Sequence, residues 1–275
     1  MKNKLYQQYI LKLHSDKILK AKKDLKISLG QARSNGELVS LSDSNCLRMI
    51  DNINEVDRIS VQNKINSIRK EINIKTVKSS NDKNIGYIQI SSFISTSTPN
   101  EFLEALENTQ NAKGLIVDLR GNTGGLLTNA VFIANVFIEK GKLVSIVGRN
   151  GYRYDVMAQD TNLDIEKPVI ILVNGTSASA SEILSGAMKD YHRAKIIGTK
   201  TYGKGMVQKI IPMPNETGLN LTIAKYLTPK GKDINKKGIS PDVEVELSKN
   251  DIIEHKDVQL ETAKRIMNTM IAKKK

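Results

Sequence analysis

Apolar and polar residues follow two different patterns along this chain, and the change falls near residue 85. Residues 4–27 place leucines and isoleucines among lysines at approximately helical spacing, which predicts an amphipathic helix. Residues 67–77 alternate as in a strand, and residues 79–84 (Ser-Ser-Asn-Asp-Lys-Asn) have the composition of a loop. We therefore expect three parts: a basic helical N-terminal segment at 1–60, a linker at 61–85 and a core domain at 86–275.

The core domain alternates apolar strands with helices. Apolar runs predict strands at 86–93, 114–120, 142–147, 168–173, 194–198, 207–211 and 219–226. Helical spacing predicts helices after Pro99, over 126–137 and over 182–188. Strands that are apolar throughout belong to a sheet covered on both faces. The pattern thus predicts an α/β fold with a mixed sheet covered by helices, whose functional loops lie at the carboxyl ends of the strands.

Composition narrows the class of protein. Hydrophobic residues make up 39% and charged residues 26% of the 275 residues, which is ordinary for a globular chain. The single cysteine, Cys46, excludes an internal disulfide framework and a cysteine-rich metal site. A membrane-spanning helix needs about 20 apolar residues, and no apolar run in this chain approaches that length. The basic residues at the N-terminus are not followed by the apolar stretch of a secretory signal. We expect neither a transmembrane segment nor a signal peptide in this chain.

The net charge of +13 is concentrated at the two ends of the chain. Residues 1–80 hold 16 Lys and Arg against 8 Asp and Glu, and residues 273–275 are three lysines. A basic arm can attract an acidic partner, but no segment interleaves Lys or Arg with aromatic residues as single-strand binders do. We therefore expect no nucleic-acid partner, and association with nucleic acid through the basic arm is the weakest of the functional hypotheses.

A run of small residues with three hydroxyls follows the predicted strand 168–173. Ser177, Ser179 and Ser181 lie where that strand turns into a helix. A serine at such a turn is exposed at the edge of the sheet, and the N–H groups at the helix start can hold an oxyanion. The same serines can instead cap the helix, with Glu182 completing a capping box. Local sequence alone favours capping.

A serine nucleophile needs a base, and the three histidines are poor candidates. His14 lies in the basic arm and His255 in the polar C-terminal stretch. His192 ends the helix that begins at the serines, and a helix of about ten residues spans about 15 Å. Lysine can act as a base when desolvation keeps its amine neutral. Lys204 lies between two glycines ahead of an apolar strand; without further information an ordinary hairpin lysine is the simpler interpretation.

The segment around Lys204 also matches the glycine and lysine spacing of a phosphate-binding P-loop, over residues 198–205. That motif needs Ser or Thr after the lysine and a helix whose N-terminus holds the phosphates. Here Gly205 follows the lysine and the next residues alternate as a strand, so this match does not predict a nucleotide site.

Six motifs stand in a fixed order along the core: Gly86–Phe93, Asp118–Gly125, Ser177–Ile183, Thr201–Gln208, Tyr226–Gly231 and Lys237–Asp242. Together they resemble the carboxyl-terminal processing peptidases, also called tail-specific proteases. Each motif alone is weak, but the ordered set is highly specific and covers about residues 68–265. The resemblance implies a crotonase-like ββα core and a serine peptidase that uses a Ser/Lys dyad.

The resemblance also assigns roles to residues. It implies that Ser179 is the nucleophile, Lys204 the general base and Gln208 the residue that orients the amine. On a strand, Lys204 and Gln208 would share a face. The backbone N–H groups of Gly125 and Ala180 would form the oxyanion hole, and Asp190 would have a supporting role. The implied reaction is acyl transfer through an acyl-enzyme, with no metal and no cofactor.

The region ahead of residue 86 departs from the family pattern. Family members usually carry a PDZ domain there, which binds substrate C-termini by strand addition, whereas this chain shows at most a last strand of it, near 68–77. Family members also usually work outside the cytoplasm, whereas no signal peptide is expected in this chain, so the sequence predicts no cellular compartment for this protein. The expected partners are protein or peptide substrates with accessible C-termini, and a homo-oligomer is compatible with this interpretation. The alternative function is a catalytically impaired peptide-binding or scaffold protein that retains the peptidase fold.

Overall fold

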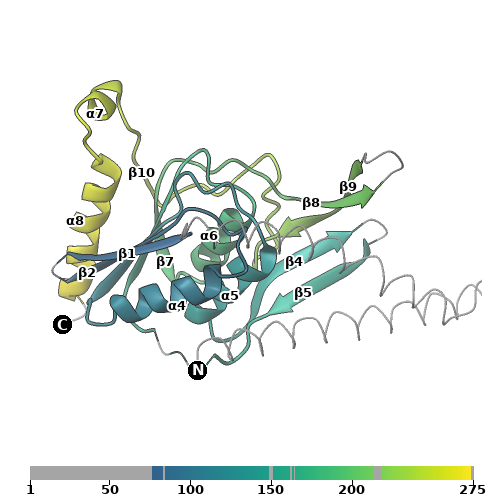
Figure 1. Ribbon diagram of the computed structural model, residues 1–275, viewed down its shortest axis with the longest axis horizontal. Helices are drawn as coiled ribbons and strands as arrows, with labels where there is room; N and C mark the ends of the chain where they lie inside the picture. The colour runs from purple at the N-terminus through teal and green to yellow at the C-terminus, as the bar shows by residue number, and fades with distance from the viewer. Residues whose placement is uncertain are drawn as a thin grey trace, which may run out of the picture. The chain divides into compact units, whose positions relative to one another are not determined.

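The computed structural model describes residues 76–273 apart from 83, 149–150, 162, 164 and 213–217. The predicted N-terminal helical segment and most of the predicted linker lie outside these residues. Within the described part of the chain, no helix is long and apolar enough to cross a membrane. The described elements form two sheets and the helices that pack on them (Figure 1).

The first sheet has six strands in the order β1-β2-β3-β6-β7-β10. Strand β1 pairs antiparallel with β2, and the other pairs are parallel. Its central strands β3 and β6 are buried at every position, because helices cover both faces. The strands are β1 (Val77–Asp82), β2 (Ile85–Ile90), β3 (Gly114–Asp118), β6 (Val169–Val173), β7 (Ala194–Gly198) and β10 (Val243–Glu244).

Helices cover the two faces of the first sheet (Figure 1). On one face, Ala263 and Met267 of α8 pack against Ile116 and Ile170 of the central strands. On the other, α4 packs on β1 and β2, α6 packs on β7, and α5 packs on α4 and α6. The helices are α4 (Thr98–Asn108), α5 (Leu127–Phe137), α6 (Ala180–Asp190), the short α7 (Lys249–Ile253) and α8 (Val258–Lys273).

The second sheet has four antiparallel strands in the order β5-β4-β9-β8. They are β4 (Lys142–Gly148), β5 (Arg153–Met157), β8 (Met206–Pro212) and β9 (Gly218–Leu227). Helices α5 and α6 pack against β4, so α6 lies between the two sheets. The loop after β6 and the loop before β8 thereby approach each other at the start of α6.

The strands and helices predicted from β2 to β9 are confirmed, β5 was not predicted, and the α/β fold with a mixed, helix-covered sheet is observed. The loop predicted at 79–84 is wrong at 79–82, which lie in β1 and pair with β2. Most side chains of β1 are exposed, because it is an edge strand. A solvated edge strand carries polar residues, and its composition therefore resembles that of a loop.

Candidate active site

The turn from β6 into α6 holds Ser179 in a strained conformation. Its φ is 55° and its ψ is −112°, a region that residues other than glycine rarely adopt and that is found mostly at functional sites. Neighbouring loops brace the turn: the buried hydroxyl of Ser177 donates to the Leu119 carbonyl and that of Ser181 to the Asn122 carbonyl, both at 2.9 Å. Of the three predicted serines, Ser179 is the one that is only half buried, and it is therefore the one that can meet a substrate.

The loop after β3 packs directly on Ser179. The Ala178 N–H donates to the Asn122 carbonyl at 3.1 Å. A Cβ atom added to Gly124 would lie 2.9 Å from Ser179 Cβ and 3.0 Å from Ala180 N, so no larger residue fits there. In the described part of the chain, the N–H groups of Gly125 and Ala180 donate to no acceptor. Two available N–H groups beside a nucleophile are what an oxyanion requires.

Glu182 connects the serine turn with the lysine loop. Its fully buried carboxylate accepts four hydrogen bonds. Oε2 accepts from the N–H groups of Ser179 and Lys204, each at 2.8 Å, and Oε1 accepts from the Gly203 N–H and the Thr201 hydroxyl, each at 2.6 Å. The two backbone nitrogens that share Oε2 are thus no further apart than twice 2.8 Å. The sequence alone assigned Glu182 only a capping role, because the loop with Lys204 that it binds lies about 20 residues further along the chain.

Lys204 lies in the loop ahead of β8, and not in the strand. The Gly203 carbonyl accepts from the Lys236 N–H at 2.8 Å, and the Gly205 carbonyl accepts from the Tyr226 N–H of β9 at 2.7 Å. Pairing with β9 thus begins just after Lys204. The prediction that Lys204 shares a strand face with Gln208 therefore does not apply. Both side chains are exposed, and no hydrogen bond joins the Lys204 amine to Ser179 among the described residues.

The remaining predicted residues lie at the far end of α6. Asp190 is the last residue of the helix and is buried, and His192 follows it. The Asp190 carboxylate accepts from the Lys230 N–H at 2.9 Å, so it anchors the turn after β9 and does not approach Ser179. His192 is distant from Ser179, as the helix length predicts.

A partly buried ion-pair network holds the base of the loop after β3, and sequence reasoning missed it. Arg120 binds Asp118 through Nε at 3.0 Å and Nη2 at 2.6 Å, and it binds Asp257 through Nη1 and Nη2 at 2.7 Å each. The Tyr87 hydroxyl donates to Asp118 at 2.7 Å. Because Asp257 lies just ahead of α8, this network ties the C-terminal helix to the segment that continues into Gly121–Gly125.

The network changes the protonation of its members. Burial, together with the Asp118 carboxylate, raises the pKa of the Tyr87 hydroxyl well above its usual range. Burial would lower the pKa of Arg120, but its bonds to Asp257 and Asp118 outweigh burial and raise the pKa. For the Asp257 carboxyl, burial acts in the opposite direction and would raise the pKa. The Arg120 guanidinium nevertheless holds the pKa of Asp257 below its usual range. Arg120 is therefore a permanently charged link between two carboxylates.

No group of three or more His, Cys, Asp or Glu that could hold a metal ion occurs in the described part of the chain. At the start of α6 the described residues offer a hydroxyl, an amine, a buried carboxylate and backbone N–H groups. This set suits nucleophilic attack with an oxyanion held by N–H donors.

Comparison with known proteins gives consistent matches. The model of peptidase family S41 matches residues 84–245. A carboxy-terminal-processing protease of Bartonella bacilliformis is 44% identical over 191 residues, which cover 66% of this chain and 43% of that protein. The carboxy-terminal processing protease CtpA of Bacillus subtilis is 41% identical over 198 residues, which cover 70% of this chain and 42% of that protein. The chain thus spans less than half the length of these relatives.

Solved structures also match. A photosystem II D1 C-terminal processing protease is 34% identical and superposes with a TM-score of 0.58, covering 63% of this chain and 49% of that one. A peptidase structure from Parabacteroides merdae superposes with a TM-score of 0.61 at 22% identity, covering 74% of this chain and 69% of that one. The second likeness is one of fold alone.

Proposed function

This chain belongs to peptidase family S41, and we propose that it is a serine endopeptidase that cleaves proteins near their C-termini. In this proposal Ser179 is the nucleophile and Lys204 is the general base, as the relatives named carboxy-terminal processing proteases favour. The crotonase-like description of the core belongs to the same proposal. No metal or cofactor takes part in it.

The proposed reaction is acyl transfer. The neutral Lys204 amine removes the proton from the Ser179 hydroxyl, and the oxygen attacks a peptide carbonyl carbon. The N–H groups of Gly125 and Ala180 hold the oxyanion, and the lysine then protonates the leaving amine. Water, activated by the same lysine, hydrolyses the acyl-enzyme and restores the hydroxyl. Gln208 would orient the amine, and Asp190 would support the site from the far end of α6.

The observation that carries the proposal is the position of Glu182. A single carboxylate oxygen accepts from the backbone N–H groups of both Ser179 and Lys204, at 2.8 Å each. The two residues that the dyad requires are therefore fixed close together at their backbones, although they come from different loops. A strained, half-buried serine beside two available N–H groups adds independent support.

Catalysis requires the Lys204 side chain to turn toward Ser179. The flexible four-carbon stem of lysine allows this turn without movement of the loop, because Glu182 and two backbone hydrogen bonds fix only the backbone of the loop. General bases are often poorly aligned before the substrate binds.

The proposal is tested by cleavage of an unstructured protein substrate. Ser179→Ala and Lys204→Ala should each lower kcat by at least about a thousandfold, with circular dichroism spectra and thermal midpoints like those of the unmodified chain. Lys200→Ala, which removes another exposed lysine of the same loop, is the matched control and should retain activity. Full activity of either Ser179→Ala or Lys204→Ala would overturn the proposal. Peptide affinity without turnover in the unmodified chain would instead support the binding-protein alternative.

A further inference from the structure

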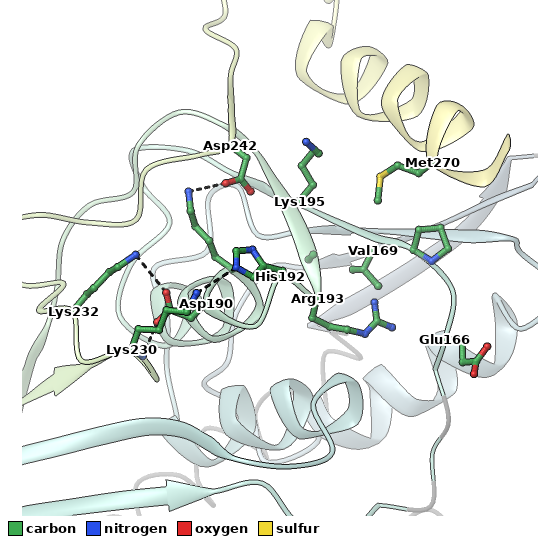
Figure 2. Close-up of a pocket in the computed structure, with 13 residues that line it drawn as sticks. Glu166, Val169, Asp190, His192, Arg193, Lys195, Lys230, Lys232, Asp242 and Met270 are labelled. Carbon is green, nitrogen blue, oxygen red and sulfur yellow. Dashed lines mark hydrogen bonds and ion pairs between the residues drawn. The ribbon is translucent and has the colours of Figure 1, made fainter. Parts of the chain in front are cut away.

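A hollow of about 660 Å³ lies at the end of α6 opposite Ser179 (Figure 2). Its volume is within the usual range for binding pockets. The end of α6, the starts of β6 and β7, the turn after β9 and Met270 of α8 form its walls. Pro168, Val169, Ala194 and Met270 are the apolar part of its lining, and most of the other lining side chains are charged.

The charged lining carries more cations than anions. It has five lysine and arginine side chains against three carboxylates. Asp242 pairs with Lys189 at 2.9 Å, and Asp190 pairs with Lys232 at 3.6 Å. Among the described residues, no carboxylate pairs with the exposed side chains of Lys195 and Lys230, whose charges are therefore available to a ligand.

The two available lysines lie on separate elements of the hollow (Figure 2). Lys195 belongs to β7, whereas Lys230 lies in the turn after β9. The buried Asp190 accepts from the Lys230 N–H at 2.9 Å and so fixes that turn against α6. The Lys230 amine lies 3.3 Å from His192 Nε2, which is an imidazole nitrogen and not a carboxylate. A ligand would thus meet two positive groups, with His192 between them and the apolar side chains of Val169 and Met270 to one side (Figure 2).

The hollow is a poor phosphate site. The Arg193 guanidinium, which could bind phosphate in a bidentate manner, donates instead to the backbone carbonyls of Ile165 and Lys167. Single negative charges spaced along an apolar chain fit the separated lysines better. A peptide with carboxylates on either side of apolar residues has this character.

We propose that this hollow is an exosite that binds an acidic stretch of peptide through Lys195 and Lys230. The inference rests on the proposed peptidase function, because the ligand would be a segment of the protein substrate. Helix α6 has 11 residues and so separates the hollow from Ser179 by about 16 Å. The exosite would therefore lower KM for acidic substrates and leave kcat unchanged.

The test measures binding in the absence of turnover. A fluorescein-labelled peptide that alternates leucine with aspartate is titrated with the full chain carrying Ser179→Ala, and fluorescence anisotropy reports the Kd. The same peptide with asparagine in place of aspartate should bind about tenfold more weakly. The double variant Lys195→Gln/Lys230→Gln should raise the Kd of the aspartate peptide about 3- to 10-fold.

A second pair of exposed lysines provides the control. Lys113→Gln/Lys140→Gln makes the same change in net charge away from the hollow and should leave the Kd unchanged. Equal affinity for both peptides, or an equal loss in both double variants, would overturn the proposal. Displacement of the peptide by inorganic pyrophosphate at lower concentration than by succinate would overturn it as well, in favour of a phosphate site. Because the readout is binding, loss of the proposed peptidase function would leave this test intact.

Discussion

Replacement of Glu182 by glutamine tests how the site is held together. Glutamine keeps one acceptor oxygen and replaces the other by an NH₂ group. If the acceptor stays at the Oε2 position, it still serves Ser179 and Lys204, and the NH₂ group can donate to the Thr201 hydroxyl. The Gly203 N–H then loses its acceptor. One unsatisfied buried donor costs about 1–3 kcal/mol, so we expect the free energy of unfolding to fall by this amount.

The same substitution should affect catalysis beyond its effect on stability. Displacement of Gly203 moves the loop that carries Lys204, and a misplacement of about 1 Å can lower a rate about 100-fold. We expect kcat of Glu182→Gln to fall about 100-fold with KM little changed. Steady-state kinetics with an unstructured protein substrate would measure the loss, and urea denaturation would measure the stability.

Glu101 provides a matched control for Glu182. Its carboxylate accepts from the Thr76 N–H, the Thr76 hydroxyl and the Val77 N–H at 2.7 to 2.9 Å, and from the Ser97 hydroxyl at 2.6 Å. Glu101→Gln therefore disturbs a similar four-bond acceptor that ties β1 to α4. It should lose a comparable amount of stability and keep kcat. Equal losses of kcat in both variants would refute the reasoning.

Four further outcomes follow from the site. Ser179→Gly should unfold with a free energy about 1–3 kcal/mol higher than Ser179→Ala in urea titrations, because glycine relieves the positive φ that alanine retains; equal stabilities would show that the turn is unstrained. Gly124→Ala should lower both stability and kcat, because its Cβ would meet the Ala178 carbonyl oxygen at 2.8 Å; wild-type kinetics would contradict this. Asp257→Asn should lower kcat/KM about tenfold by releasing Arg120, with unchanged kinetics as the contrary result. The lowered pKa of Asp257 stabilises the fold above the ordinary carboxyl pKa of 3.8, and this contribution is lost as the pH falls through the lower folded-state value; the urea midpoint of the unmodified chain should therefore decrease more steeply toward about pH 3 than that of Asp257→Asn.

The sequence predicted the parts of this fold whose burial is uniform. Strands β3 and β6 are apolar at every position because both of their faces are covered, and this leaves a clear pattern. The sequence pattern did not predict strand β1 or helix α8, and the reason differs between the two. Strand β1 is polar because it is an edge strand, and α8 buries only Gln259, Ala263 and Met267, too narrow a stripe to be noticed among charged residues.

The sequence also predicted only part of the candidate site. Ser179 and Lys204 were identified through the family resemblance, and their roles stay predictions until they are tested. The contacts of Glu182 and Asp257 could not be found by spacing, since each binds residues about 20 or more positions away through side-chain geometry. The serine-rich motif did carry a signal. Ser177 and Ser181 are part of it because their hydroxyls bind the neighbouring loop, a packing role that a search for nucleophiles does not consider.

The placement of α6 between two sheets has a consequence for how this chain could be divided. The serine turn extends from the six-stranded sheet, whereas the lysine loop leads into the four-stranded one. A chain cut between β7 and β8 would yield two fragments, each with one residue of the proposed dyad, and reassociation of the fragments, with the Glu182 carboxylate again binding both loops, would bring these residues together. Complementation between such fragments would report how well the two parts recognise each other without a covalent connection.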